Sequence, residues 1–103
     1  MIKSIAAAIA LTITIGGLTV DARAQGYNLE GPWTCVARCQ IQGGRMYIEQ
    51  RRRGLTLINE VRQVSRGYLA DPFTIVATDW NLTGRISRDG GTIFWANGSR
   101  WAR

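Results

Sequence analysis

Histidine is absent from this 103-residue sequence, and cysteine and proline occur only twice each. Without histidine the chain has no Ser–His or Cys–His nucleophile pair and no imidazole ligand for a metal ion. Glycine is plentiful, but none of it has the spacing of a phosphate-binding loop, and Gly90-Gly91 is typical of a hairpin turn. These absences exclude the commonest routes to nucleophilic, metal-dependent and phosphate-transfer catalysis.

Carboxylates are also few. A glycosidase needs two carboxyl groups about 5–10 Å apart, and Glu49 and Glu60 would approach each other if their strands paired across residues 51–54. Ion pairing with neighbouring arginines is the interpretation that we favour. We therefore predict no catalytic residue, no cofactor and no metal ligand, and a protein that is not an enzyme. The acidic residues after position 24 are Glu30, Glu49, Glu60, Asp71, Asp79 and Asp89.

The long apolar run of the sequence stands at its start. Met1-Ile2-Lys3 gives a basic beginning, residues 5–20 are apolar, and Ala22-Arg23-Ala24 ends the run with an A-x-A pattern. These are the three parts of a secretory signal peptide, which predicts cleavage after residue 24. The apolar run is shorter than the roughly 20 residues that span a bilayer, so an uncleaved membrane anchor is the less favoured alternative. We predict no transmembrane segment in the mature chain.

The mature chain, residues 25–103, is long enough for a single small domain. It carries eleven arginines, no lysine and six acidic residues, a net charge of about +5. Arginine forms bidentate contacts with carboxylates, phosphates and sulfates. The charge therefore predicts an exported protein, periplasmic or secreted, that meets an acidic envelope glycan, a lipid or an acidic protein surface. Genome base composition is the alternative explanation. Nucleic acid would suit the charge but is not expected as the partner of an exported chain.

The two cysteines, Cys35 and Cys39, are separated by three residues. In an oxidising compartment the simplest expectation is that they pair with each other. Four positions of extended strand span about 13 Å, whereas a disulfide allows about 6 Å between Cα atoms. Residues 36–38 must therefore curl into a turn. We expect a structural disulfide; a zinc site or a redox-active pair fits the spacing and the absence of histidine less well.

From Arg45 onward, polar and apolar residues alternate with the period of a β-strand. Turn signals such as Asp71-Pro72, Asp89-Gly90-Gly91 and Asn97-Gly98 recur about every ten residues, the spacing of a sandwich or barrel. Residues 59–66 give a weak helical signal. The sequence thus predicts an all-β fold, a small antiparallel barrel or barrel-like meander. The expected strands are 45–50, 55–58, 67–70, 73–78, 84–88, 92–95 and 99–103.

The alternation also predicts which side chains face the core. Arg45, Glu49, Arg85 and Arg88 should point outward or line an opening. The pairs expected to face inward together are Met46 and Ile48, Leu55 and Leu57, Phe73 and Ile75, and Ile93 and Trp95.

Two short motifs carry a resemblance. Gly31-Pro32-Trp33 is similar to the G-x-W start of the calycins, the superfamily of lipocalins, fatty-acid-binding proteins and avidins. That resemblance implies a barrel in which Trp33 packs under a basic residue of the last strand, Arg100 or Arg103, and closes one end. Residues 93–101 resemble the I-x-W-x-N-G-[ST]-x-W ending of small exported bacterial proteins of unassigned role.

The candidate partner-binding residues are the densest charges and two tryptophans. Arg51, Arg52 and Arg53 are expected at a hairpin tip, where they either dock an acidic surface or form a solvated turn. Trp80 and Trp101 stand near polar residues and either form an exposed platform or pack in the core, whereas Trp33 and Trp95 are expected in the core.

The sequence therefore predicts a non-enzymatic exported binding domain that uses a basic Arg/Trp surface to bind an acidic partner. The first alternative is a periplasmic inhibitor of a hydrolase such as a lysozyme or protease, with a rigid hairpin loop that plugs an active site. The second is a small-ligand carrier, with a cavity lined by Met46, Ile48 and Leu57.

Overall fold

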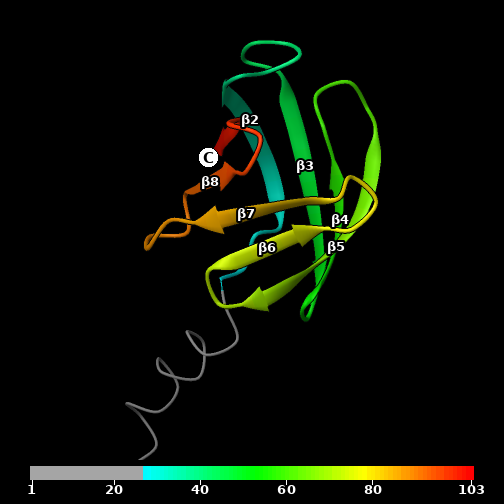
Figure 1. Ribbon diagram of the computed structural model, residues 1–103, viewed down its shortest axis with the longest axis vertical. Helices are drawn as coiled ribbons and strands as arrows, with labels where there is room; N and C mark the ends of the chain where they lie inside the picture. The colour runs from blue at the N-terminus through cyan, green and yellow to red at the C-terminus, as the bar shows by residue number, and fades with distance from the viewer. Residues whose placement is uncertain (1–26) are drawn as a thin grey trace, which may run out of the picture.

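The computed structural model describes residues 27–103, which form one closed antiparallel barrel (Figure 1). The predicted signal peptide, residues 1–24, lies outside the described residues. Each strand pairs with the next along the chain, and the last pairs with the first, which confirms the predicted all-β barrel. The strands of the described part are β2 (Gly31–Ala37), β3 (Arg45–Arg51), β4 (Gly54–Ile58), β5 (Val64–Asp71), β6 (Thr74–Ala77), β7 (Leu82–Ile86), β8 (Thr92–Trp95) and β9 (Arg100–Ala102).

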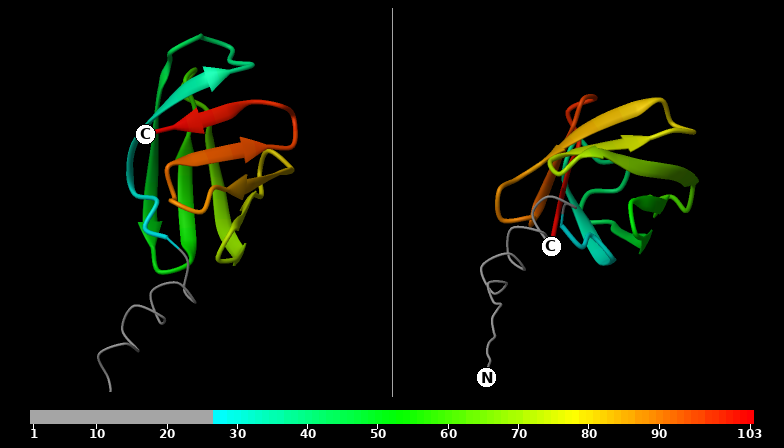
Figure 2. Two further views of the ribbon diagram at one scale, coloured as in Figure 1. Left: turned by 90° about the vertical axis from the view of Figure 1, so that its left-hand side faces the viewer. Right: turned by 90° about the horizontal axis from the view of Figure 1, so that it is seen from below.

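Successive connections of this up-and-down barrel lie at alternate ends (Figures 1 and 2). We call the end that carries the β2–β3, β4–β5, β6–β7 and β8–β9 connections the mouth. We call the opposite end, with the other three connections and residues 27–30, the closed end. None of the described residues belongs to a helix long and apolar enough to cross a bilayer.

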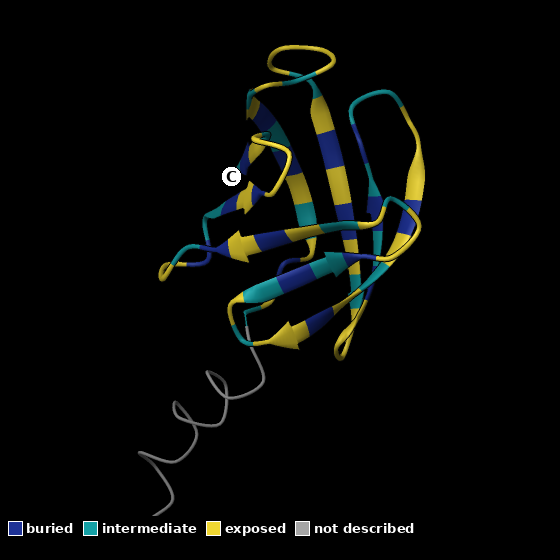
Figure 3. Cartoon of the chain, viewed as in Figure 1, coloured by how far each residue is buried: buried dark blue, intermediate teal, exposed yellow. Residues whose placement is uncertain are grey.

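Buried and exposed residues alternate along the strands (Figure 3). As predicted, the pairs Met46 and Ile48, Leu55 and Leu57, and Ile93 and Trp95 all point into the core. The expected outward residues Arg45, Glu49, Arg85 and Arg88 are exposed. Met46, Ile48 and Leu57, the expected lining of a carrier cavity, are each at most 2% exposed and pack in one cluster with the other core side chains.

Phe73 corrects one part of this pattern. It was expected to face inward with Ile75, but it lies in the β5–β6 turn and is 38% exposed. The pairing of β5 with β6 shifts register between Leu69 and Asp71, and an Asp71 carboxylate oxygen accepts the backbone N–H of Phe73. This turn breaks the alternation, and the Phe73 ring instead lies 5.9 Å from that of Tyr27.

The weak helical signal of residues 59–66 is also wrong. These residues form a tight turn followed by the start of β5. The Asn59 side-chain oxygen accepts the backbone N–H groups of Val61 and Gln63, and Arg62 adopts a left-handed backbone conformation with φ of 67°. Asparagine side chains stabilise such turns by this local bonding in competition with a helix.

The predicted disulfide joins Cys35 and Cys39, whose Cα atoms are 5.8 Å apart. As the spacing required, the chain curls between them: β2 ends at Ala37, and Arg38 has a φ of 49°. A disulfide in this domain is consistent with an oxidising compartment.

The closed end is sealed by Trp33 and Arg103. Trp33 is 1% exposed, and its indole N–H donates to the carbonyl of Leu29 at 2.8 Å. The guanidinium carbon of Arg103 lies 4.6 Å from the centroid of the Trp33 ring. The same guanidinium donates to the carbonyls of Gly90 and Asn28, so it ties the last residue to two neighbouring segments. Arg100, the other candidate for this contact, points outward from β9 and lies over Phe94.

Candidate binding cleft at the mouth of the barrel

A cleft of about 360 Å³ opens at the mouth, where all four mouth connections contribute to its wall. This volume falls within the range of small-molecule sites, about 300–1,000 Å³. Its apolar part comes from strand ends and the β6–β7 turn: Trp80, Leu82, Trp95 and Trp101. Its polar part comes from the loops around it: Arg38, Gln40, Asn59, Glu60, Gln63, Asn97 and Ser99.

The three tryptophans form one connected aromatic group. The Trp101 ring lies edge-on to Trp95, with centroids 5.2 Å apart, and edge-on to Trp80, with centroids 6.4 Å apart. Trp95 and Trp101 are each 4% exposed, whereas Trp80 is half-buried. Trp101 therefore does not form an exposed platform, because its position on β9 turns it inward beside Trp95. The cleft has two buried indoles in its wall and one accessible indole, Trp80.

Trp95 has an unsatisfied donor. Its indole nitrogen is buried and has no hydrogen-bond partner among the described residues. Trp33 offers a contrast within the same barrel, because its indole N–H is bonded to Leu29. An unpaired buried donor costs about 1–3 kcal/mol, and buried tryptophans normally find an acceptor. Trp95 lines the cleft, but its indole nitrogen is closed to solvent, so a ligand would reach this donor only after the side chains that cover it shift.

The turn that carries Trp80 is held by its neighbour Asp79. Two carboxylate oxygens of Asp79 accept from the guanidinium of Arg66, at 2.8 and 3.1 Å, and one also accepts the backbone N–H of Arg66. The backbone N–H of Asp79 donates to the hydroxyl of the buried Ser65. These contacts fix the β6–β7 turn to β5 and thereby position Trp80.

The Arg66–Asp79 pair gives a testable pH dependence. Hydrogen bonds from the Arg66 side chain and backbone lower the pKa of Asp79 from 3.8 to about 2. A carboxyl whose pKa is lowered in the folded state stabilises the fold above its unfolded pKa, and this contribution is lost as the pH falls through the folded pKa. We expect Asp79→Asn to lower the melting temperature modestly at pH 7, since the pair is solvent-exposed. The difference from the unmodified protein should shrink below pH 4 and vanish only below pH 2, as measured by thermal unfolding. A constant difference across this range would contradict the assignment.

The polar rim is organised by side-chain contacts with the loops. The Asn59 side-chain amide donates to Gln63, and Glu60 accepts the backbone N–H of Gln40 at 2.7 Å. The Arg38 side chain packs against Gly98 in the β8–β9 turn, where an added Cβ would lie 2.7 Å from its Cδ. These contacts link three of the four mouth connections, so the rim is pre-ordered around the cleft.

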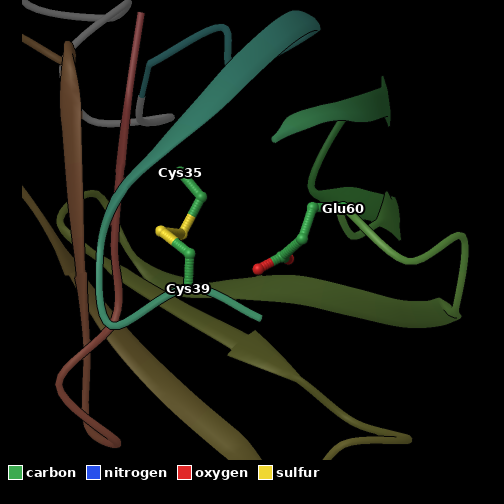
Figure 4. Close-up of side chains that lie close together, drawn as sticks. All are labelled: Cys35, Cys39 and Glu60. Atoms are coloured by element: carbon green, nitrogen blue, oxygen red, sulfur yellow. A yellow bond between two sulfur atoms is a disulfide. The ribbon is translucent and has the colours of Figure 1, made fainter. Parts of the chain in front are cut away.

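The disulfide lies beside this rim. Cys39 stands between Arg38 and Gln40, both of which line the cleft. The two sulfurs and a carboxylate oxygen of Glu60 lie within 4.8 Å of one another (Figure 4). Both sulfurs are already bonded to each other, so neither is a thiolate available to a metal. We interpret the disulfide and Glu60 as structural contacts that hold the β2–β3 loop in place.

The structure separates the predicted partner-binding residues. Arg51, Arg52 and Arg53 form the exposed tip between β3 and β4, at the closed end, whereas Trp80 and Trp101 lie at the mouth. Arg53 donates to the carbonyl of Leu69, which holds the tip against β5. The tip and the tryptophans therefore do not form one surface, because their connections stand at opposite ends of an antiparallel barrel.

Comparison of the chain with protein-family models, curated proteins and solved structures finds no match. The barrel is established by its own strand pairing, whereas kinship with the calycins stays a prediction.

Proposed function

We propose that this protein is a non-enzymatic exported binding domain whose mouth cleft holds a sugar residue of an envelope or extracellular glycan. The observation that carries the proposal is the aromatic group at the mouth with the unpartnered indole N–H of Trp95. A sugar ring offers both an apolar C–H face and oxygen atoms that accept hydrogen bonds. The cleft offers the accessible Trp80 ring as an apolar surface, and the Trp95 donor lies buried in the wall behind it.

The loops supply further polar contacts of the kind that orient such a ligand. Asn59, Gln63, Asn97 and Ser99 bring amide and hydroxyl groups to the same cleft, and Arg38 brings a positive charge. A few placed polar groups around an apolar surface are typical of small-molecule sites. Arg38 would favour a sugar that carries a carboxylate or sulfate, whereas Glu60 in the same wall would oppose one.

A titration of the purified protein with neutral and acidic mono- and oligosaccharides, followed by tryptophan fluorescence and calorimetry, tests this proposal. We expect binding of at least one saccharide class, and we expect Trp80→Ala to weaken it about ten-fold or more, as loss of a central aromatic contact does. The matched control is Tyr68→Ala, which removes an aromatic that is 46% exposed on the outer face of β5. Absence of saccharide binding, or equal binding by both variants, would overturn the proposal.

A carrier cavity lined by Met46, Ile48 and Leu57 finds no support, because these side chains fill the core. Inhibition of a hydrolase by a hairpin loop stays a prediction that a panel of lysozymes and proteases would test.

A further inference from the structure

A row of basic and aromatic side chains crosses the outer wall of the barrel. The strand register places Arg85 of β7 opposite Phe94 of β8, and Phe94 opposite Arg100 of β9. All three side chains are exposed, and the Arg100 guanidinium carbon lies 5.4 Å from the centroid of the Phe94 ring. Two strand spacings separate the two arginines, about 10 Å. The wall thus presents one aromatic ring between two positive charges.

The row continues into a shallow hollow toward the closed end. This hollow, of about 490 Å³, is lined by Arg85 and Arg88 together with Ile86 and the paired aromatics Tyr27 and Phe73. The Tyr27 hydroxyl donates to the carbonyl of Arg88, and this bond holds residues 27–30 against the β7–β8 turn. We call Arg85, Arg88, Phe94 and Arg100 the basic wall.

The positive charge of the basic wall is not neutralised locally. Within residues 27–103 the ion pair joins Arg66 and Asp79, which lie outside the basic wall. The acidic residue that faces Arg85 is Asp71, and its carboxylate already accepts from the backbone of Phe73 and the hydroxyl of Thr74. The described strands β7, β8 and β9 carry no carboxylate. The β7–β8 turn that holds Arg88 also holds Asp89, whose carboxylate accepts from the Ser87 hydroxyl and the Gly91 backbone N–H. The arginines are therefore available to an external anion.

The basic wall runs between the two ends of the barrel. Arg100 follows Ser99 and precedes Trp101, both of which line the mouth cleft. Arg88, at the other extreme, stands in the β7–β8 turn of the closed end. An extended ligand could therefore contact all four residues along one path.

We propose that the basic wall binds a linear acidic polysaccharide, with its carboxylate or sulfate groups on Arg85, Arg88 and Arg100 and a sugar ring against Phe94. Positive charges on either side of an aromatic ring suit a polymer whose sugar rings carry negative groups. A bilayer would call for a broader apolar patch than the single exposed ring between these arginines. This inference stands apart from the mouth cleft, since it uses none of the residues that line it.

The test measures affinity of the purified protein for polygalacturonate and dextran sulfate at low and at physiological salt. We expect the variant R85Q/R100Q to bind either polymer about ten-fold more weakly or worse, with a shallower salt dependence, because two anion contacts are lost. The matched control is R51Q/R52Q, which removes the same charge from two exposed arginines at the β3–β4 tip and should change the affinity by about two-fold at most.

Three outcomes would overturn the proposal. Equal losses in both variants would mean that only net charge matters, and a loss confined to R51Q/R52Q would move the site to the tip. Stronger binding to phosphatidylglycerol vesicles or single-stranded DNA, lost in R85Q/R100Q, would assign the wall to a different partner. Trp80→Ala should leave polymer binding at the basic wall within about two-fold, so failure of the mouth site and failure of the wall can be told apart.

Discussion

Replacing Trp33 by alanine is expected to lower the free energy of unfolding by about 3–5 kcal/mol, the usual cost of removing a large buried aromatic. Trp33 is 1% exposed, donates to the carbonyl of Leu29, and carries the Arg103 guanidinium over its ring. The substitution would remove the buried ring together with both contacts and leave a cavity at the closed end. Because the core of so small a domain supplies only about 3–5 kcal/mol, the variant should be largely unfolded at 37 °C, as urea titration and far-UV circular dichroism would show.

Two controls locate the effect at the closed end. Trp80→Ala removes the same side chain from a half-buried position at the mouth and should cost clearly less stability. Arg103→Gln should cost about 1–2 kcal/mol, since it removes the cation from the Trp33 ring and weakens the bonds to Gly90 and Asn28. Equal destabilisation by Trp33→Ala and Trp80→Ala would contradict the view that Trp33 and Arg103 seal the barrel.

Gly84→Ala is expected to destabilise the protein by about 1–3 kcal/mol through overpacking. Gly84 is buried on β7, and a Cβ there would lie 2.9 Å from the Trp95 ring, 3.0 Å from Ile93 and 3.1 Å from Ile75. Three neighbours from two adjoining strands would have to move at once. The same substitution at Gly54 meets a single neighbouring atom, the Arg51 carbonyl oxygen at 3.5 Å.

Urea unfolding of both glycine variants provides the comparison. Gly54→Ala should lie within about 0.5 kcal/mol of the unmodified protein, as surface substitutions usually do. If Gly84→Ala were equally mild, the interior beneath Trp95 would have to be loosely packed, contrary to the structure.

The barrel could be predicted because its signals are local. Alternation along residues 45–50 fixes which side chains face inward, and Asn97-Gly98 supplies the positive φ that a tight hairpin needs, with Gly98 at 91°. The spacing of Cys35 and Cys39 likewise predicts the turn between them. The predictions for Phe73 and for the segment after Asn59 were wrong because the Asp71 and Asn59 side chains form hydrogen bonds with nearby backbone, and these bonds override the periodicity.

The candidate site was harder to predict because it is assembled from separate turns. Knowing that connections alternate between ends would have grouped Trp80 with residues 38–40, 59–63 and 97–99, and separated it from the Arg51–Arg53 tip. The role of Trp95 could not be found in this way. Its alternation marks it as core, and the missing partner of its indole N–H depends on how all its neighbours pack.

The most direct test of the binding cleft is nuclear magnetic resonance of the indole N–H groups in ¹⁵N-labelled protein. The chain has four tryptophans, so each signal can be assigned with one Trp→Phe variant. On saturation with a saccharide, we expect the Trp95 indole proton to move downfield and exchange more slowly as it gains an acceptor. The Trp33 signal should stay unchanged, because its N–H is already bonded to Leu29. A Trp95 signal that does not move under any saccharide tested would contradict the assignment of the mouth cleft as a binding site.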